Sequence, residues 1–406
     1  MNRLPQNFLF GSATSAHQVE GGNHNDWTEW EQKSAARLAA QANSSMNYGQ
    51  GPSPIWLEIK AAAKAEGNYI SGEAVGHYAL YKEDLAMARS LGLTAFRFSV
   101  EWSRIEPQKG VYDQAAIDHY VDVAKACLEH GQEPFVTLWH FTLPVWAAAE
   151  GGWESGLVVR HFAEYARRMG EVLELYVNNF STLNEPEVYS TLAYLWGKWP
   201  PQRLTPGRFS KVRQGLVKAH IGAYQGLKAV NPEFKVGFST SQTLFEATYH
   251  LLQMANDYFV KRLAPHSDWL GVQFYLKRSF DRRKLAQKSD MGWELHPEGH
   301  YEVLKRLARY KKPMFVTESG LADAADRHRA WYIEESLGSI AKATSEGIDC
   351  RGYFYWSLLD NFEWHEGFWP KFGLIEVDRS TMGRRIRPSA KHYAKLITDY
   401  GKITRR

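Results

Sequence analysis

The sequence predicts an α/β fold, namely a single-domain (β/α)8 TIM barrel with extended βα loops. Eight short β-prone runs alternate with longer segments of helical periodicity, which is the pattern of parallel strands connected by helices. No Pro/Gly/Ser-rich or charge-rich linker divides the 406 residues. Because such barrels often exceed ~250 residues without a second domain, we expect residues 1–406 to form one barrel domain.

The expected strands are short runs rich in apolar and aromatic residues. They lie at residues 8–12, 95–100, 134–138, 180–183, 235–239, 269–275, 313–317 and 352–356. Between them, helical spacing of apolar residues predicts helices over residues 81–92, 115–130, 159–176 and 210–230. Strand and helix in repeated alternation are what the barrel requires.

Two long segments are expected to form loops at the carboxyl ends of strands. Residues 32–76 follow the first strand and contain an Ala-rich piece, 59–66, that we expect to form a short helix. Residues 357–373 follow the eighth strand and are rich in Gly and Trp. Long loops inside a compact domain are commonly functional, so both segments mark the same end of the barrel as the place to look for a site.

Composition and charge narrow the possible functions. Hydrophobic residues make up 44% of the chain and charged residues 23%, which is typical of a globular protein. The net charge of +4 is small and dispersed, whereas a nucleic-acid partner would require a clustered basic face. The N-terminus lacks the apolar stretch of a signal peptide, and no apolar run of ~18 residues offers a membrane span. We therefore expect a cytoplasmic protein without nucleic-acid or membrane partners, and the oligomeric state stays open.

Cysteine and histidine usage argues against metal chemistry. Cys127 and Cys350 are too few for a disulfide framework or a structural zinc site, and we expect both to be buried. A metal hydrolase on this barrel would need His and Asp clustered at strand ends, where the sequence offers only His140. We expect neither a metal nor another cofactor.

Two of the expected strands run directly into a glutamate. The run 180–183 is followed by Asn184 and Glu185, and the run 313–317 is followed by Glu318. Each could be an ordinary solvated loop residue. In a parallel barrel, however, the carboxyl ends of the strands surround one crevice. Two carboxyl groups about 5–5.5 Å apart are the apparatus of retaining glycoside hydrolysis, in which one attacks the sugar and the other protonates the leaving oxygen.

Other strand ends carry side chains that suit the same chemistry. Arg97 is a cation inside an apolar run, and because burying an unpaired charge is costly it needs a carboxylate, for which Glu318 is the candidate. Gln18 and His140 can bind sugar hydroxyls, and Tyr275 can donate to a carboxylate nucleophile. Aromatic residues make up 14% of the chain, many of them at expected loop positions. A sugar ring or a protein partner could cover these aromatic side chains.

Five ordered motifs resemble glycoside hydrolase family 1, the retaining β-glycosidases, over nearly the whole chain. The matching segments are residues 8–21, 96–105, 182–186, 317–320 and 355–364. The resemblance implies that Glu185 is the acid/base, Glu318 the nucleophile and Asn184 the ligand of the hydroxyl at sugar carbon 2. It further implies a set of substrate-binding and supporting residues, namely Gln18, His140, Glu363 and Trp364 for the other hydroxyls, Trp356 as the platform, Trp293 on the leaving-group side, and Arg97 and Tyr275 holding the nucleophile.

Several positions depart from the family pattern. Gln273-Phe274-Tyr275 stands where Asn-Tyr-Tyr is usual, Ser319 stands for an asparagine after Glu318, and Phe141-Thr142 replaces an aromatic-acid pair. None removes a catalytic group. They change the polar surroundings of the nucleophile, and a shorter connection between strands five and six could open the leaving-group side.

The resemblance implies a retaining exo-β-glycosidase, most simply a β-glucosidase that tolerates galactosides or fucosides, with an oligosaccharide or β-glycoside as substrate. A 6-phospho-β-glycosidase would have a serine at Glu363 and phosphate-binding Lys and Tyr near Pro370 and Phe372, so it is disfavoured. A thioglucosidase would lack the acid at Glu185. A catalytically impaired sugar-binding barrel is the alternative from another functional class.

Overall fold

The computed structural model describes residues 3–44, 52–245, 250–278 and 287–404. Eight parallel strands close a barrel in the order β1-β10-β9-β7-β5-β4-β3-β2, which confirms the predicted fold. The barrel strands are β1 (Leu9–Ala13), β2 (Ala95–Ser99), β3 (Glu133–Thr137), β4 (Asn179–Asn184), β5 (Lys235–Ser241), β7 (Trp269–Gln273), β9 (Met314–Ser319) and β10 (Cys350–Trp356).

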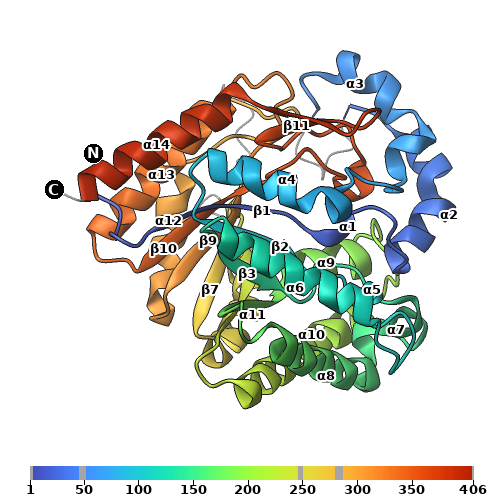
Figure 1. Cartoon of the computed structure of the whole chain (residues 1–406). Coiled ribbons are helices and arrows are strands. Elements are labelled where there is room, and N and C mark those ends of the chain that lie inside the picture. The colour runs from blue at the N-terminus through green and yellow to red at the C-terminus, as the bar shows by residue number, and fades with distance from the viewer. Residues whose placement is uncertain (1–2, 45–51, 246–249, 279–286, 405–406) are drawn as a thin grey trace.

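Helices surround the barrel, with α4 and α6 in front of the strands and α8 and α10 below them in Figure 1. Their bounds are α1 (Ala16–Val19), α2 (Asp26–Gln41), α3 (Trp56–Ala63), α4 (His77–Ser90), α5 (Trp102–Ile105), α6 (Gln114–Glu129), α7 (Val145–Ala149), α8 (Gly156–Leu173), α9 (Pro186–Tyr194), α10 (Pro206–Val230), α11 (His250–Leu263), α12 (Gly299–Leu307), α13 (Arg329–Ser345) and α14 (Pro388–Thr404). At Gly215 of α10, an added Cβ would lie 1.8 Å from the carbonyl oxygen of Trp153. Only glycine therefore permits this close approach.

The expected strands coincide with the observed ones to within two residues at every end. The differences of two residues lie at the ends of β5, β7 and β9 and at the start of β10. Since β7 ends at Gln273, the prediction that this strand continues to Tyr275 was wrong. Glu318 lies within β9, whose last residue is Ser319, and not directly after the strand. Glu185 does follow its strand, because β4 ends at Asn184.

The long segment after the first strand is more helical than expected. Helix α2 runs to Gln41, so the predicted start of a loop at residue 32 was wrong. The helix is capped by Asn25, whose side chain accepts a hydrogen bond from the backbone N–H of Thr28 at 3.0 Å. The short helix expected over 59–66 is α3, which begins and ends three residues earlier. Residues 45–51 of the expected loop lie outside the described residues.

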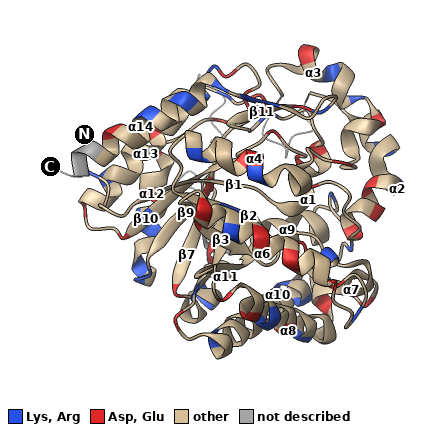
Figure 2. Cartoon of the chain, in the orientation of Figure 1, with Lys and Arg blue, Asp and Glu red and all other residues tan. Residues whose placement is uncertain are grey.

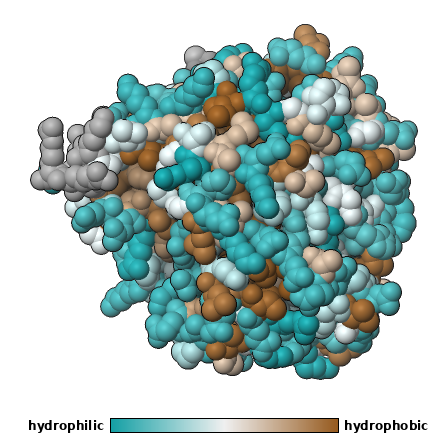
Figure 3. Space-filling view, in the orientation of Figure 1, coloured by the Kyte–Doolittle hydropathy of each residue, from teal (hydrophilic) through white to brown (hydrophobic). Residues whose placement is uncertain are grey.

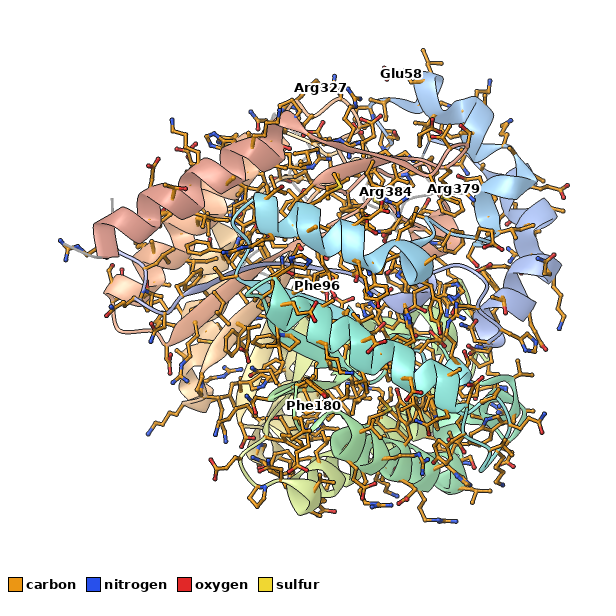
Figure 4. All side chains as sticks on the ribbon, viewed as in Figure 1. Glu58, Phe96, Phe180, Arg327, Arg379 and Arg384 are labelled. Atoms are coloured by element: carbon orange, nitrogen blue, oxygen red, sulfur yellow. The ribbon has the colours of Figure 1, made fainter. Side chains whose placement is uncertain are left out.

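Three smaller features lie outside the barrel strands. The antiparallel hairpin of β11 (Ile375–Asp378) and β12 (Gly383–Ile386) follows the eighth βα loop and was not predicted. Arg384 of this hairpin lies over α4 in Figure 4, where its Nε donates to Asp84 at 2.9 Å. Two short strands, β6 (Leu244–Phe245) and β8 (Lys277–Arg278), pair in parallel.

Aromatic rings fill the interior of the barrel, whereas charged residues lie on the outer helices. Four rings from four strands, Phe135, Trp269, Phe315 and Phe354, pack edge to face inside the barrel with centroids 4.9 to 6.0 Å apart. Charges of both signs alternate along the outer helices in Figure 2, and the face in Figure 3 is mostly hydrophilic with small hydrophobic groups.

Both cysteines are buried free thiols, as expected. In the described ranges, every helix is too short or too polar to cross a bilayer.

Candidate active site

Glu185 occupies a strained junction between a strand and a helix. It follows β4 directly and caps α9, with φ 40° and ψ 58° in the left-handed region. A non-glycine residue in this conformation costs of order 1–3 kcal/mol and persists where the surrounding structure enforces it. Its backbone N–H donates to the carbonyl of Ser239 in β5 at 2.8 Å, which fixes the turn. The side chain is 8% exposed and lines a cavity at the carboxyl ends of the strands.

Glu318 is held by a cation and a phenol. The Arg97 guanidinium donates from Nη1 to Glu318 Oε1 at 2.5 Å, and the Tyr275 hydroxyl donates to Oε2 at 2.7 Å. Arg97 is fully buried in β2, so the ion pair expected from the sequence is present. Two charge-assisted bonds from opposite sides fix the carboxylate and leave its orientation little freedom.

Asn184 is linked to Glu318 through Arg97 in a hydrogen-bond network. Its Oδ1 accepts from Arg97 Nη2 at 2.6 Å and from Gln273 Nε2 at 2.9 Å. Its Nδ2 must therefore be the donor to His140 Nε2, 3.0 Å away, which places the imidazole proton on Nδ1. Burial, with Arg97 and His17 nearby, lowers the pKa of His140 well below its ordinary value. His140 is thus a neutral ring.

The two carboxyl groups have different proton affinities. Burial raises the pKa of Glu185 well above its ordinary value, and repulsion from Glu318 and then Glu187 raises it further. Burial also raises the pKa of Glu318, but the charge of Arg97 and the hydrogen bond from Tyr275 oppose that rise. Of the pair, Glu185 therefore keeps the proton near neutral pH while Glu318 is the carboxylate.

The cavity beside these groups has a volume of about 530 Å³. Nine of the residues predicted for the site line it, namely His140, Asn184, Glu185, Tyr275, Trp293, Glu318, Trp356, Glu363 and Trp364. Gln18 and Arg97 are the other two, and they are fully buried behind the lining residues. A volume of this size accommodates more than a small polar ligand.

The first and eighth βα loops meet at Gln18 and Glu363. Gln18 Nε2 donates to the carbonyl of Phe362 at 2.7 Å and to Glu363 Oε2 at 3.4 Å. Burial, then repulsion from Glu318, raises the pKa of Glu363 to about 8. The Trp364 ring stacks on His140 with centroids 6.0 Å apart and an interplanar angle of 18°.

The positions that depart from the family pattern have different consequences. Gln273 reaches the surroundings of Glu318, where its Nε2 donates to Asn184 and its Oε1 is buried without a hydrogen-bond partner among the described residues. Ser319 points elsewhere, since its hydroxyl donates to Tyr332 at 3.3 Å. Thr142 donates to Glu101 at 3.0 Å. Of Gln273, Ser319 and Thr142, only Gln273 therefore contacts Asn184 and Glu318.

The part of the cavity along α9 was not predicted from the sequence. Glu187, Arg213 and Gln242 line it, together with one face of α9 formed by Val188, Thr191, Leu192 and Leu195. The spacing of these four residues is i, i+3, i+4 and i+7, so the pattern was readable as a helix face. The pattern does not indicate whether this face borders a cavity or the core.

Comparisons with known proteins agree with this geometry. The model of glycosyl hydrolase family 1 matches residues 1–258 and 259–402. β-Glucosidase A of Thermotoga maritima is 29% identical over 468 aligned positions, covering 99% of each chain, and the β-galactosidase of Saccharolobus solfataricus is 28% identical, covering 100% of this chain and 96% of the relative.

Solved structures give the same result. A β-glycosidase from Pyrococcus horikoshii is 32% identical with a TM-score of 0.83, covering 98% of this chain and 96% of that one. A β-glucosidase from Thermotoga maritima in complex with glucoimidazole is 27% identical with a TM-score of 0.82, covering 98% and 100%. The chain therefore belongs to glycosyl hydrolase family 1 and is a β-glucosidase-like glycoside hydrolase.

Proposed function

We propose that the protein is a retaining exo-β-glycosidase that removes terminal β-D-glucosyl residues, with Glu318 as nucleophile and Glu185 as acid/base. The observation that carries the proposal is the unequal environment of two buried carboxyl groups, one directly after β4 and one in β9. Glu318 is paired with Arg97, whereas Glu185 is buried beside like charges. Retaining glycosidases need one carboxylate and one carboxylic acid in this relation.

The reaction proceeds by two displacements. Glu318 attacks the anomeric carbon while Glu185 gives its proton to the glycosidic oxygen, so that the bond to the aglycone breaks and a glycosyl ester of Glu318 forms. Glu185, now a carboxylate, takes a proton from water as the water oxygen attacks the same carbon. The ester bond to Glu318 breaks, glucose leaves with retained configuration, and both carboxyl groups return to their starting states.

The remaining predicted residues bind the glycone. Asn184 and His140 hold hydroxyls near the nucleophile, Gln18 and Glu363 hold those at the far end, Trp356 lies beneath the ring, and Trp364 lines the same wall. Trp293 contacts the leaving group. Because Gln18 and Glu363 can serve either epimer at carbon 4, β-galactosides and β-fucosides are expected as weaker substrates.

The charge around Glu363 disfavours a phosphorylated glycone. Glu318 and Glu366 both repel negative charge there and raise the pKa of Glu363. A 6-phosphate would add two more negative charges at that wall.

Hydrolysis of an aryl β-glucoside followed by proton NMR tests the proposal. β-Glucose should be the first product, and the aryl α-glucoside should be untouched. Initial release of α-glucose would mean inversion and would overturn the retaining mechanism. No turnover of β-gluco-, galacto- or fucosides would favour the sugar-binding alternative.

Tyr275→Phe is expected to move the acid limb of the kcat/KM profile to higher pH by about one unit. The change removes the 2.7 Å hydrogen bond that lowers the pKa of Glu318, and a hydrogen bond to a charged group contributes about 1.5–3 kcal/mol. Tyr224→Phe, which removes a bond to Asp268 on the outer surface, should leave the profile unchanged. An unshifted acid limb in Tyr275→Phe would show that the phenol does not stabilise the ionised nucleophile.

Glu187→Gln is expected to move the basic limb to lower pH by less than about one unit. The Glu187 carboxylate repels Glu185 and raises its pKa, so a neutral side chain lets Glu185 lose its proton earlier. The Thr240 bond to Oε1, 2.6 Å long, can be kept by glutamine. Glu133→Gln, another carboxyl with a burial-raised pKa but at the opposite end of the barrel, is the control. A basic limb that stays in place contradicts the role of Glu187.

A further inference from the structure

A buried histidine lies next to the residues proposed to bind the glycone. His17 precedes Gln18 in α1, its side chain is fully buried, and it does not line the active-site cavity. Its Nε2 lies 2.7 Å from Oε1 of Glu31 in α2, which is also buried. Because a carboxylate only accepts hydrogen bonds, Nε2 is the donor, and this charge-assisted bond fixes the orientation of the imidazole ring.

Glu31 connects three segments of the chain. Its Oε2 accepts from the backbone N–H of Ser71 at 2.9 Å and from the Ser71 hydroxyl at 2.7 Å, while Oε1 accepts from His17. A buried carboxylate is costly unless such donors surround it, so the three hydrogen bonds hold it in one position. Glu31 therefore anchors the His17 ring both to α2 and to the segment that contains Ser71.

The His17 ring contacts the residues on both sides of Glu363. It stacks on Trp364 with centroids 5.5 Å apart and an interplanar angle of 8°, and it meets the Phe362 ring edge to face at 5.9 Å. Between these two residues, Glu363 Oε2 accepts from Gln18, the chain neighbour of His17, at 3.4 Å. One short helix thus provides both a ligand of Glu363 and the ring that packs on its two neighbours.

Trp364 has a backbone conformation that depends on its packing. Its φ of 51° lies in the left-handed region, which a non-glycine residue keeps only where its surroundings enforce it. Its ring also stacks on His140, with centroids 6.0 Å apart. A displacement of Trp364 would therefore move Glu363, the preceding residue, and change the contacts of His140. Small displacements of positioning groups lower catalytic efficiency strongly.

We propose that His17, anchored by Glu31, is a positioning residue for glycone recognition: its ring fixes Trp364 and thereby the carboxyl group of Glu363. The inference rests on the proposed function, in which Glu363 and Gln18 bind the hydroxyl at carbon 4 of the sugar. His17 itself does not touch the substrate, so its effect depends on that hydroxyl.

Two aryl β-glucosides, one with and one without the hydroxyl at carbon 4, test the proposal. In the wild type, kcat/KM should be higher for the glucoside than for its 4-deoxy analogue, because a buried hydrogen bond is lost with the hydroxyl. His17→Gln keeps a donor for Glu31 but removes the ring, so this ratio should fall about tenfold. A purely structural role would lower kcat/KM by one common factor for both substrates, and an unchanged ratio would overturn the inference.

His17→Phe separates the ring from its anchor. Phenylalanine can still stack on Trp364, but it cannot donate to Glu31, whose buried charge then loses one partner. The melting temperature should fall, and the ratio should fall about threefold because the orientation of the ring is no longer fixed. A wild-type ratio in folded His17→Phe would contradict the anchoring role of Glu31. This variant also decides the case if His17→Gln does not fold.

His77→Gln is the matched control. His77 is also buried, its Nδ1 lies 2.8 Å from the buried carboxylate of Asp84, and it does not line the cavity. This change should lower the melting temperature and leave the ratio at its wild-type value. If the ratio fell as far as in His17→Gln, it would report a general loss of packing, and the positioning role would be excluded.

Trp364→Ala shows whether His17 acts through the tryptophan ring. In this background, the further change His17→Gln should alter the ratio by less than about twofold, because the ring that it positions is already absent. A further tenfold loss would mean that His17 acts by another route, contrary to the inference.

The proposed function and this inference fail in different ways. If the wild type hydrolyses neither glucoside, the proposed function fails. If it hydrolyses both equally well, the hydrolytic function stands, but the hydroxyl at carbon 4 is not recognised and the positioning role fails. If the wild type discriminates between them and His17→Gln does so equally, only the positioning role is excluded.

Discussion

Replacing Glu318 by alanine is expected to lower kcat on an aryl β-glucoside by at least about 10⁴-fold, the size of loss seen when a member of a covalent catalytic unit is removed. Without the carboxylate no glycosyl ester can form, and nothing else on this side of the cavity replaces it, because Arg97 is a cation and Tyr275 is a neutral phenol. Steady-state release of the phenol checks this result.

Azide should restore turnover of Glu318→Ala. The vacated space lets a small anion attack the anomeric carbon directly, and the product should be the α-glucosyl azide, with the configuration inverted. Arg97 would offer the anion the charge that it now gives to Glu318. Wild-type enzyme under the same azide concentration is the control and should give no azide product. Undiminished turnover of Glu318→Ala without azide would contradict the assignment of Glu318 as nucleophile.

The variant also tests the cost of a buried charge. Removal of one partner from a buried ion pair typically costs 3–5 kcal/mol because the other charge stays buried. Here Arg97 still contacts Asn184 at 2.6 Å, and the repulsion between Glu318 and Glu185 is relieved. The melting temperature should be recorded beside the kinetics, so that loss of activity is separated from loss of fold.

Glu185→Ala is expected to show a loss that depends on the leaving group. A general acid contributes about 10²–10⁴-fold, so alkyl glucosides, whose alkoxide must be protonated, should lose the most. A dinitrophenyl glucoside needs little acid assistance for the first step and should give a burst followed by slow deglycosylation. The basic limb of the kcat/KM profile should disappear, because that limb reports the proton on Glu185.

The stereochemistry of azide rescue separates the two glutamates. In Glu185→Ala, azide intercepts the glycosyl ester and should give the β-glucosyl azide, the opposite anomer from the one expected with Glu318→Ala. Equal losses for every leaving group, or a basic limb that survives, would show that Glu185 is not the acid.

The barrel strands could be predicted because each is a short apolar run whose residues are buried on both faces, such as β4 and β9. The end of β7 was misplaced since Phe274 and Tyr275 continue the same aromatic pattern past the last paired residue. Helix α2 was not predicted, because its second half is Ala-rich and polar and its start depends on the Asn25 cap rather than on a hydrophobic stripe.

The residues of the candidate site could likewise be predicted only in part. Glu185 and Glu318 could be named because they follow apolar runs at the carboxyl ends of barrel strands. Arg97 could be named because a cation inside an apolar run demands a partner. Glu187 and Gln242 could not, since their importance depends on which groups surround them in space. Burial raises the pKa of Glu187 to about 7, although the hydrogen bond from Thr240 opposes that rise, and no local sequence pattern indicates the burial.

One stretch of twelve residues, 184–195, carries both the proposed acid, Glu185, and one wall of the active-site cavity. β4 ends at Asn184, Glu185 follows it, and α9 runs from Pro186 to Tyr194 with Leu195 as its C-cap. The proposed nucleophile, Glu318, and its ion-pair partner Arg97 lie on other strands. In the proposed reaction, the group that protonates the leaving oxygen and the helix beside it therefore belong to one continuous segment. Exchanging residues 184–195 between relatives would change the surroundings of the proposed acid and leave the ester-forming groups in place.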